Sequence, residues 1–160
     1  MLTTYTTYGD VRAALGVSID ELDDATLALK LYDDALNADF DDISGTLRAT
    51  FTTVNALTTP TTAQARFLAC ARSFATYSVS RTLLSALPMF GPKSVEDGKA
   101  KMDRFSNPIK DIAKRVEGEY DRWRARLEDA LKALGEAAAT PITRTYASAV
   151  APASNPITGE

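Results

Sequence analysis

The chain contains few of the residues that carry out chemistry in proteins. Its 160 residues include no histidine and a single cysteine, which excludes His-ligated zinc sites and both Ser–His–Asp and Cys–His catalysis. Aspartate pairs at 23–24, 33–34 and 41–42 could bind Mg²⁺ or Ca²⁺. The last two pairs fall on a predicted helix, however, where a loop-type calcium site cannot close, and no EF-hand glycine is present. We therefore expect no metal site and no cofactor.

Two further motifs are weak candidates for a chemical role. Gly91-Pro92-Lys93-Ser94 is similar to the end of a phosphate-binding loop, but it lacks the upstream glycine and the preceding strand. We interpret it as a loop that caps a helix. Cys70 falls on the apolar face of a predicted helix and is expected to be a small core residue with a reduced thiol. Because no spacing indicates a carboxylate or lysine tuned for proton transfer, the sequence predicts a protein that is not an enzyme.

Composition predicts one soluble globular domain. The chain is 45% hydrophobic and 24% charged, which is ordinary for a globular protein of this length. The opening MLTTYTTYGD has no basic segment before an apolar stretch, so we expect no signal peptide. No apolar run approaches the ~20 residues needed to span a bilayer, so we expect no membrane contact and an intracellular location.

Apolar periodicity predicts helices in the first half of the chain. A short helix covers 9–15 and ends at Gly16, where a left-handed C-cap is easiest. A second helix of about 20 residues is expected to begin at Asp23 or Asp24 and to end at Ser44-Gly45, with an acidic outer face. Its apolar stripe contains Leu29, Tyr32, Leu36, Phe40 and Ile43. Residues 46–60 are rich in threonine, and their pattern does not distinguish a short strand from an irregular loop.

Two longer helices are predicted to follow. One begins at Thr61 or Thr62 and stops before Pro88. The last is expected to run from a cap at Ser94 to Gly135, with a kink or break near Pro108. Trp123 lies on its apolar stripe and is expected to be buried. The prediction is thus an all-α bundle of about four helices over residues 1–135, followed by an extended arm, 136–160, rich in Pro, Ala and Thr.

Charge is distributed unevenly along the chain. Residues 1–60 carry three basic and ten acidic side chains, a net charge of −7, whereas residues 61–135 carry 14 and nine, a net charge of +5. Such a molecule could associate with copies of itself through unlike faces, or it could simply have two solvated faces of opposite sign. The helix around 99–132 interleaves its basic residues with acids, which is not typical of a DNA-reading helix. Non-specific contact with phosphates needs only a few of its cations.

The residues also carry a resemblance to a known family. YGDVRAALGVSIDELDDATLALKLYDDALNADFDDI, from Tyr8, resembles the start of head–tail connector (adaptor) proteins of long-tailed bacteriophages. ARFLACARSFATYSVSRTLLSALPMFGPKSVEDGKAKMDRF is similar to their later helices. The resemblance covers roughly residues 8–134 and rests on pattern and short matching segments.

The resemblance implies a helical subunit of a ring, typically twelve-fold, between the portal and the tail of the virion, after assembly in the host cytoplasm. It implies contacts with the portal protein, neighbouring copies, the next connector or tail protein, and passing genomic DNA. In similar proteins a C-terminal arm docks into the portal; here the arm offers Ile142, Arg144, Tyr146, Val150 and Ile157. Loops available for ring or tail-side contacts hold Phe51, Val54, Leu57, Met89, Phe90 and Lys93.

Two other functions remain open. A phage morphogenesis factor such as a tail-assembly chaperone would also be helical and acidic, and it would be absent from finished particles. A nucleic-acid-binding regulator would use the helix at 99–132 and would lose affinity steeply as salt rises.

Overall fold

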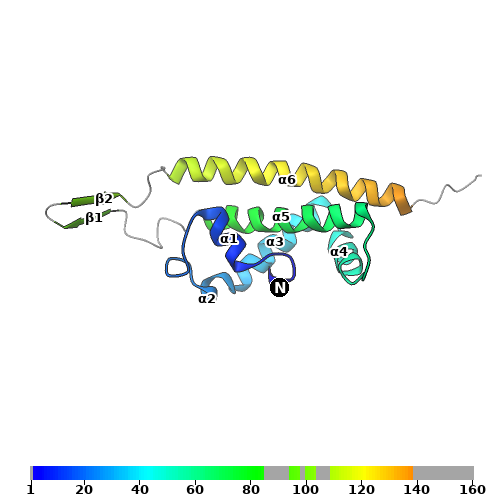
Figure 1. Ribbon diagram of the computed structural model, residues 1–160, viewed down its shortest axis with the longest axis horizontal. Helices are drawn as coiled ribbons and strands as arrows, with labels where there is room; N and C mark the ends of the chain where they lie inside the picture. Colours follow the sequence, from blue (N-terminus) through cyan, green and yellow to red (C-terminus); the bar gives the residue numbers. More distant parts are fainter. Residues whose placement is uncertain (1, 85–93, 98–99, 104–108, 139–160) are drawn as a thin grey trace, which may run out of the picture.

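The computed structural model describes residues 2–84, 94–97, 100–103 and 109–138, which form an all-α bundle with one small β-ribbon (Figure 1). Its elements in chain order are the 3-10 helix η1 (Leu2–Thr4), α1 (Tyr8–Leu15), α2 (Asp24–Leu27), α3 (Lys30–Ile43), α4 (Leu47–Asn55), α5 (Thr62–Leu84), β1 (Ser94–Asp97), β2 (Ala100–Asp103) and α6 (Ile109–Ala138). The all-α fold class predicted from the sequence is confirmed, and the helices in the described ranges number six.

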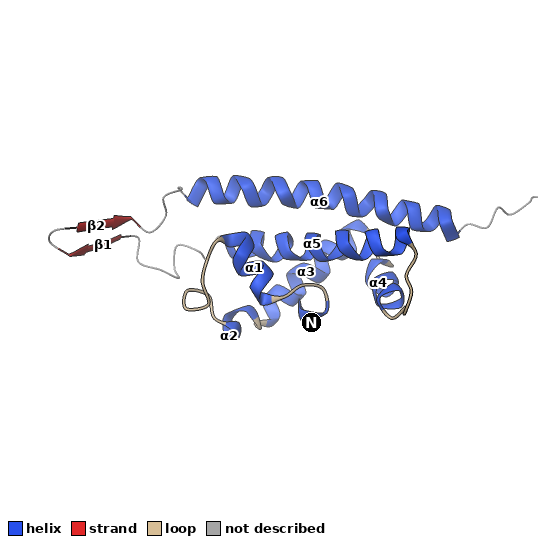
Figure 2. Cartoon of the chain, viewed as in Figure 1, coloured by secondary structure: helices blue, strands red, loops and turns tan. Residues whose placement is uncertain are grey.

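Helix α5 is the centre of the bundle. It packs against α1, α3, α4 and α6, and ten of its 23 residues are buried. Figure 2 shows α6 running alongside the whole of α5, with α1, α3 and α4 packed on the side of α5 away from α6. The two long helices run in opposite directions, because α5 ends at the end of the bundle where α6 begins (Figure 1).

Local capping explains where the first helices begin and end. The hydroxyl of Thr7 accepts a hydrogen bond from the backbone N–H of Asp10 at 3.1 Å and caps α1. Gly16 ends the helix in the left-handed conformation, with φ of 73°. Both the short helix and its glycine C-cap were predicted from the sequence, and both are confirmed.

The sequence predicts one continuous helix that starts after Asp23 or Asp24 and ends at Ser44-Gly45. This prediction is wrong in one respect, because the segment forms two helices, α2 and α3, separated at Leu29. Asp23 caps the one-turn helix α2 through the backbone N–H of Thr26, at 2.7 Å. Leu29 then adopts an extended conformation, with ψ of 134°, and is 53% exposed instead of lying on the buried stripe. This change of direction lets Leu27 reach the core from α2 while Tyr32, the first buried residue of α3, reaches it separately.

Residues 46–60 form neither a strand nor simply a loop, because most of them fold as α4. Leu47, Phe51 and Val54 recur at intervals of four and three and are all buried, the period of a helix face. The hydroxyls of Thr50, Thr52 and Thr53 donate to backbone carbonyls four residues earlier, each at 3.0 Å. Threonine is a weak helix former, so burial of the apolar face outweighs local propensity here.

Helix α5 begins at a reciprocal cap. The backbone N–H of Gln64 donates to the hydroxyl of Thr61 at 3.3 Å, and the side-chain carbonyl of Gln64 accepts from the N–H of Thr61 at 2.8 Å. This is a capping box, and it confirms the start predicted at Thr61 or Thr62.

The last helix is shorter at its start than the sequence indicates. Ser94 does not cap it; residues 94–97 and 100–103 are two antiparallel strands, with Ser94 opposite Asp103 and Asp97 opposite Ala100. Helix α6 begins at Ile109, directly after Pro108, so the break predicted there is a complete separation. Gly135 was expected to end the helix, but α6 continues to Ala138. Unlike Gly16, Gly135 does not adopt the left-handed conformation that ends a helix.

A chain of aromatic rings joins the helices in the core. Tyr5 lies 4.8 Å, centroid to centroid, from both Phe40 of α3 and Phe51 of α4. Phe40 lies 5.7 Å from Phe74, and Phe74 lies 5.2 Å from Tyr120 of α6. These tilted contacts link the N-terminal segment, α3, α4, α5 and α6 through one cluster of buried side chains.

Candidate interaction surfaces

The contact residues expected on the segment 46–60 are mostly inside the protein. Phe51 is fully buried and Val54 is 6% exposed, so neither can meet a ring neighbour or the tail side without unfolding α4. Their assignment as surface contacts is therefore corrected: they face α5 because they share the apolar side of α4 with Leu47. Leu57, which follows α4, is 43% exposed and remains available to a partner.

The other predicted contact residues lie outside the described residues. These are Met89, Phe90 and Lys93 in the segment before β1, and Ile142, Arg144, Tyr146, Val150 and Ile157 in the arm.

One surface of the described bundle is acidic. It comprises exposed aspartates of α2 and α3 together with the residue before α2, and we call it the α2–α3 acidic surface: Asp23, Asp24, Asp34, Asp41 and Asp42. Two of its members form ion pairs, Asp34 with Lys30 at 2.8 Å and Asp41 with Arg48 at 2.9 Å. A third, Asp24, pairs with Arg12 of α1.

These ion pairs only partly neutralise the acidic surface. Both partners are substantially exposed in the Asp34 and Asp41 pairs, so each contributes little to stability, about 0–1 kcal/mol. The hydrogen bonds from Thr26 hold the pKa of Asp23 below its ordinary value, which keeps this helix cap charged. The five aspartates of the surface are matched by three cations, so the surface keeps a negative excess.

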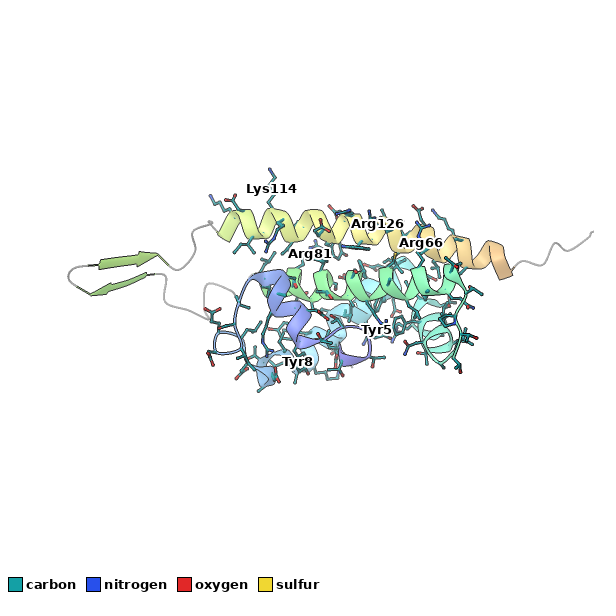
Figure 3. All side chains as sticks on the ribbon, in the orientation of Figure 1. Tyr5, Tyr8, Arg66, Arg81, Lys114 and Arg126 are labelled. Carbon is teal, nitrogen blue, oxygen red and sulfur yellow. The ribbon has the colours of Figure 1, made fainter. Side chains whose placement is uncertain are left out.

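A second surface combines arginines with aromatic rings along the α5–α6 seam, and we call it the arginine seam: Arg66, Arg81 and Arg126 (Figure 3). The guanidinium carbon of Arg81 lies 4.5 Å from the ring centroid of Tyr120. That of Arg126 lies 4.8 Å from the ring centroid of Trp123. No ion pair joins Arg81 or Arg126 to another described residue, so their charge is not neutralised within the bundle.

The positive charge belongs to α5 more than to α6. Helix α5 contains three arginines and no acidic residue, whereas α6 contains seven basic and seven acidic residues. Several α6 cations are also paired locally, for example Arg122 with Glu119 at 3.0 Å and Arg124 with Glu128 at 3.2 Å. The positive excess counted along the sequence is thus not a property of the outer face of α6, and it includes Lys93, Lys99 and Arg104, which lie outside the described residues.

Trp123 is half-buried, which differs from the full burial expected from its place on the stripe. It packs against the core, and the guanidinium groups of Arg126 and Arg122 lie over its ring, with the guanidinium carbon of Arg122 at 5.9 Å from the ring centroid. The sequence did not identify this arginine–aromatic arrangement, although the i,i+3 spacing of Trp123 and Arg126 is a signal for it.

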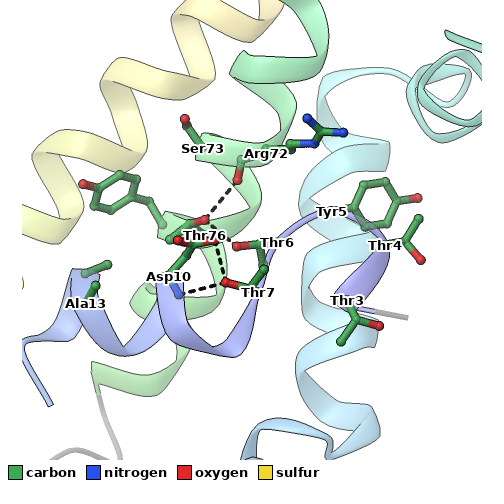
Figure 4. A pocket seen from close by; sticks show the side chains of 12 residues that line it. Thr3, Thr4, Tyr5, Thr6, Thr7, Asp10, Ala13, Arg72, Ser73 and Thr76 are labelled. Carbon is green, nitrogen blue, oxygen red and sulfur yellow. Dashed lines mark hydrogen bonds between the residues drawn. The ribbon is translucent and has the colours of Figure 1, made fainter. Parts of the chain in front are cut away.

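A polar groove of about 620 Å³ separates the N-terminal threonines and α1 from α5 (Figure 4). The hydroxyls of Thr6 and Thr76 share a hydrogen bond of 2.6 Å, and Thr7 donates to the carboxylate of Asp10 at 2.6 Å. These bonds join α1 to α5 and cap α1. The titratable groups that line the groove are the carboxylate of Asp10, the guanidinium of Arg72 and the phenols of Tyr5 and Tyr77, and the Asp10 carboxylate already accepts the hydrogen bond from Thr7.

A smaller groove lies where α6 passes α4 and the start of α5. Its volume is about 450 Å³, and we call it the apolar groove; its lining includes Thr50, Val54, Gln64, Leu131, Leu134 and Gly135. The hydroxyl of Thr50 already donates a hydrogen bond to the backbone carbonyl of Thr46 at 3.0 Å. The groove therefore offers mainly apolar contact, and sequence reasoning could not find it because three separate helices form it.

The remaining candidates from the sequence give no site. Cys70 is buried, as predicted, and burial raises the pKa of its thiol. The described residues bring together no group of three Cys, Asp or Glu side chains with metal-binding geometry. Within the same residues, no helix is both long and apolar enough to cross a bilayer.

Comparison of the chain with protein-family models, with curated proteins and with solved structures finds no match.

Proposed function

We propose that this protein is a structural subunit of a bacteriophage head–tail connector, assembled as a ring between the portal and the tail of the virion. The proposal rests first on the resemblance of residues 8–134 to such adaptors. A bundle built around one long antiparallel helix pair is consistent with that architecture.

The observation that carries the proposal is the pair of unlike charged surfaces. The α2–α3 acidic surface belongs to α2 and α3, whereas the arginine seam belongs to α5 and α6, the other helix that packs along α5. A ring of identical subunits needs a heterologous interface, in which one face of a copy meets a different face of the next. Opposite charges on two faces favour that arrangement and speed the encounter, since like faces repel each other.

The arm and the loops complete the proposed assembly. The C-terminal arm, of which residues 136–138 are part of α6, docks into the portal protein, so that attachment depends on the portal. The opposite side of the ring meets the next connector or tail protein. Passing genomic DNA makes non-specific phosphate contacts with cations that line the channel.

The balanced charge of α6 favours this structural role over a nucleic-acid-binding regulator. A helix with seven basic and seven acidic residues lacks the positive excess that is typical of a DNA-reading helix. A tail-assembly chaperone is distinguished by its absence from purified virions.

The direct test mixes the purified protein with the portal protein of the same phage and measures the native mass of the product. The same mixture is repeated with residues 139–160 deleted, a boundary that leaves α6 intact. We expect a defined ring on the portal that is lost with the arm, while the far-UV circular dichroism of the truncated bundle stays helical. A truncated protein that still binds the portal would contradict the role of the arm, and no complex with the full chain would contradict the ring.

Charge reversal tests the proposed interface separately. Arg81→Glu with Arg126→Glu should abolish ring formation, because the acidic surface of the next copy would then meet carboxylates. Adding Asp34→Lys and Asp42→Lys to the same chain should restore part of it. Lys114→Glu with Lys132→Glu, two exposed positions on the outer face of α6, is the matched control with the same change of charge. Equal loss in both sets would refute a specific interface.

A further inference from the structure

The apolar groove lies close to the point where the chain leaves α6. Gly135 lines the groove, and α6 ends three residues later at Ala138, about 4.5 Å further along the helix axis. Residues 139–160 follow from that point. A groove at the base of a 22-residue segment is within immediate reach of the first residues of that segment.

The sequence does not favour a continuation of α6 as far as Ile142. Pro141 cannot continue a helix, and it disfavours helical backbone for Thr140 before it. Ile142 is therefore the first large apolar residue after the helix, and Tyr146 follows four residues later. Four extended residues span about 13 Å, enough for Ile142 to return over Gly135.

The chemistry of the groove matches these two side chains. Val54, Leu131 and Leu134 supply apolar walls, while the amide of Gln64 lies beside them. In an extended chain residues 142, 144 and 146 point to the same side, so the long side chain of Arg144 has to pass along the apolar wall and keep its guanidinium in solvent. The segment between Ala138 and Val150 carries one charge, Arg144, so little charge has to be desolvated at this contact.

We propose that Ile142 and Tyr146 of the chain's own C-terminal segment dock in the apolar groove before assembly. The arm is then held on its own subunit, and a partner must displace it. This goes beyond the proposed function and does not depend on it, because the contact lies within one chain.

Disulfide trapping in the isolated full-length protein tests the contact. All variants carry Cys70→Ala, so that the introduced thiols are the only ones. The test pair is Thr50→Cys with Ala147→Cys, which joins the groove to the segment and keeps both Ile142 and Tyr146. The matched control is Thr52→Cys with Ala147→Cys, because Thr52 lies on the exposed side of the same helix and does not line the groove. Non-reducing electrophoresis measures the rate of the intramolecular disulfide in dilute solution.

We expect the test pair to close about tenfold faster than the control, because docking raises the effective concentration of the second thiol. Adding Ile142→Asp, which leaves the described bundle untouched, should reduce the test rate to that of the control. Equal rates for both pairs would overturn the proposal. A disulfide that forms only between two chains would also overturn it, and would assign the groove to the arm of a neighbouring copy.

Discussion

The free energy of unfolding should depend far more on Phe74 than on Trp123, although both are aromatic residues at the interface of α5 and α6. Phe74 is fully buried, with its ring 5.7 Å from that of Phe40 and 5.2 Å from that of Tyr120. Truncation to alanine removes one ring from the middle of the cluster and leaves a cavity between the rings of Phe40 on α3 and Tyr120 on α6. We expect Phe74→Ala to lower the free energy of unfolding by about 3–5 kcal/mol.

Truncation of Trp123 to alanine should lower the free energy of unfolding by less than truncation of Phe74, although tryptophan is larger, because Trp123 is only half-buried. If about 100 Å² of its surface is removed from water, burial contributes about 2.5 kcal/mol. The contacts with Arg122 and Arg126 are at the surface and add about 0.5–1 kcal/mol. Alanine keeps one buried methyl group, worth about 0.8 kcal/mol. We therefore expect Trp123→Ala to cost about 2–3 kcal/mol, less than the value for a tryptophan fully enclosed in the core.

Urea denaturation followed by far-UV circular dichroism measures both values, with the slope checked for two-state behaviour. Phe74→Leu is the control for shape, since it keeps most of the buried volume and should cost less than about 1.5 kcal/mol. A Trp123→Ala cost equal to or above that of Phe74→Ala would place Trp123 inside the core and refute the packing of α6 described above. A cost below 1 kcal/mol for Phe74→Ala would refute the aromatic cluster itself.

Two further predictions follow from local geometry. Thr61→Ala should cost about 1 kcal/mol by removing the cap of α5, whereas Thr58→Ala in the preceding loop should be neutral; equal values in urea denaturation would contradict the capping box. Burial raises the pKa of Tyr5, Tyr32 and Tyr120 above the ordinary value of 10.0. Because the same tyrosines ionise earlier in the unfolded chain, their contribution to stability should be complete below pH 10.0 and lost as pH rises through their raised pKa values. Phenolate absorbance that rises at the ordinary pKa without any loss of helix would contradict this.

The sequence correctly predicted those helix ends where a capping residue lies directly beside the end of a periodic apolar pattern. The short helix closed by Gly16 and the capping box at Thr61 are of this kind, because each depends on neighbouring residues alone. The boundary near Pro108 was located for the same reason. At Gly16 and Thr61 the backbone hydrogen-bonding groups at the helix end are satisfied locally, so no distant contact is needed to decide the structure there.

The predictions that were wrong depended on contacts between distant segments. The helix α4 is rich in threonine, and only the burial of Phe51 beside Tyr5 makes its helical form favourable. Leu29 fits the apolar period of α3, yet the backbone is extended at this residue. The change of direction lets Leu27, on the separate helix α2, reach the core. In the segment 94–103, Met102 continues the spacing of α6 by coincidence while the backbone forms a hairpin. A periodic pattern identifies a helix only where the whole segment has a core to face.

Candidate surfaces were harder to predict than helices, and the count of basic residues shows why. Arg122 and Arg124 are counted with Arg81 and Arg126 in the sequence, but each of the first two is paired with a glutamate on its own helix. An arginine over an aromatic ring is held in place without a carboxylate to neutralise it, so it keeps its charge for another chain. If the proposed ring is correct, Arg81→Glu should therefore weaken assembly much more than Arg124→Glu. Equal effects in the native-mass measurement would mean that net charge, and not the arrangement on the α5–α6 seam, determines association.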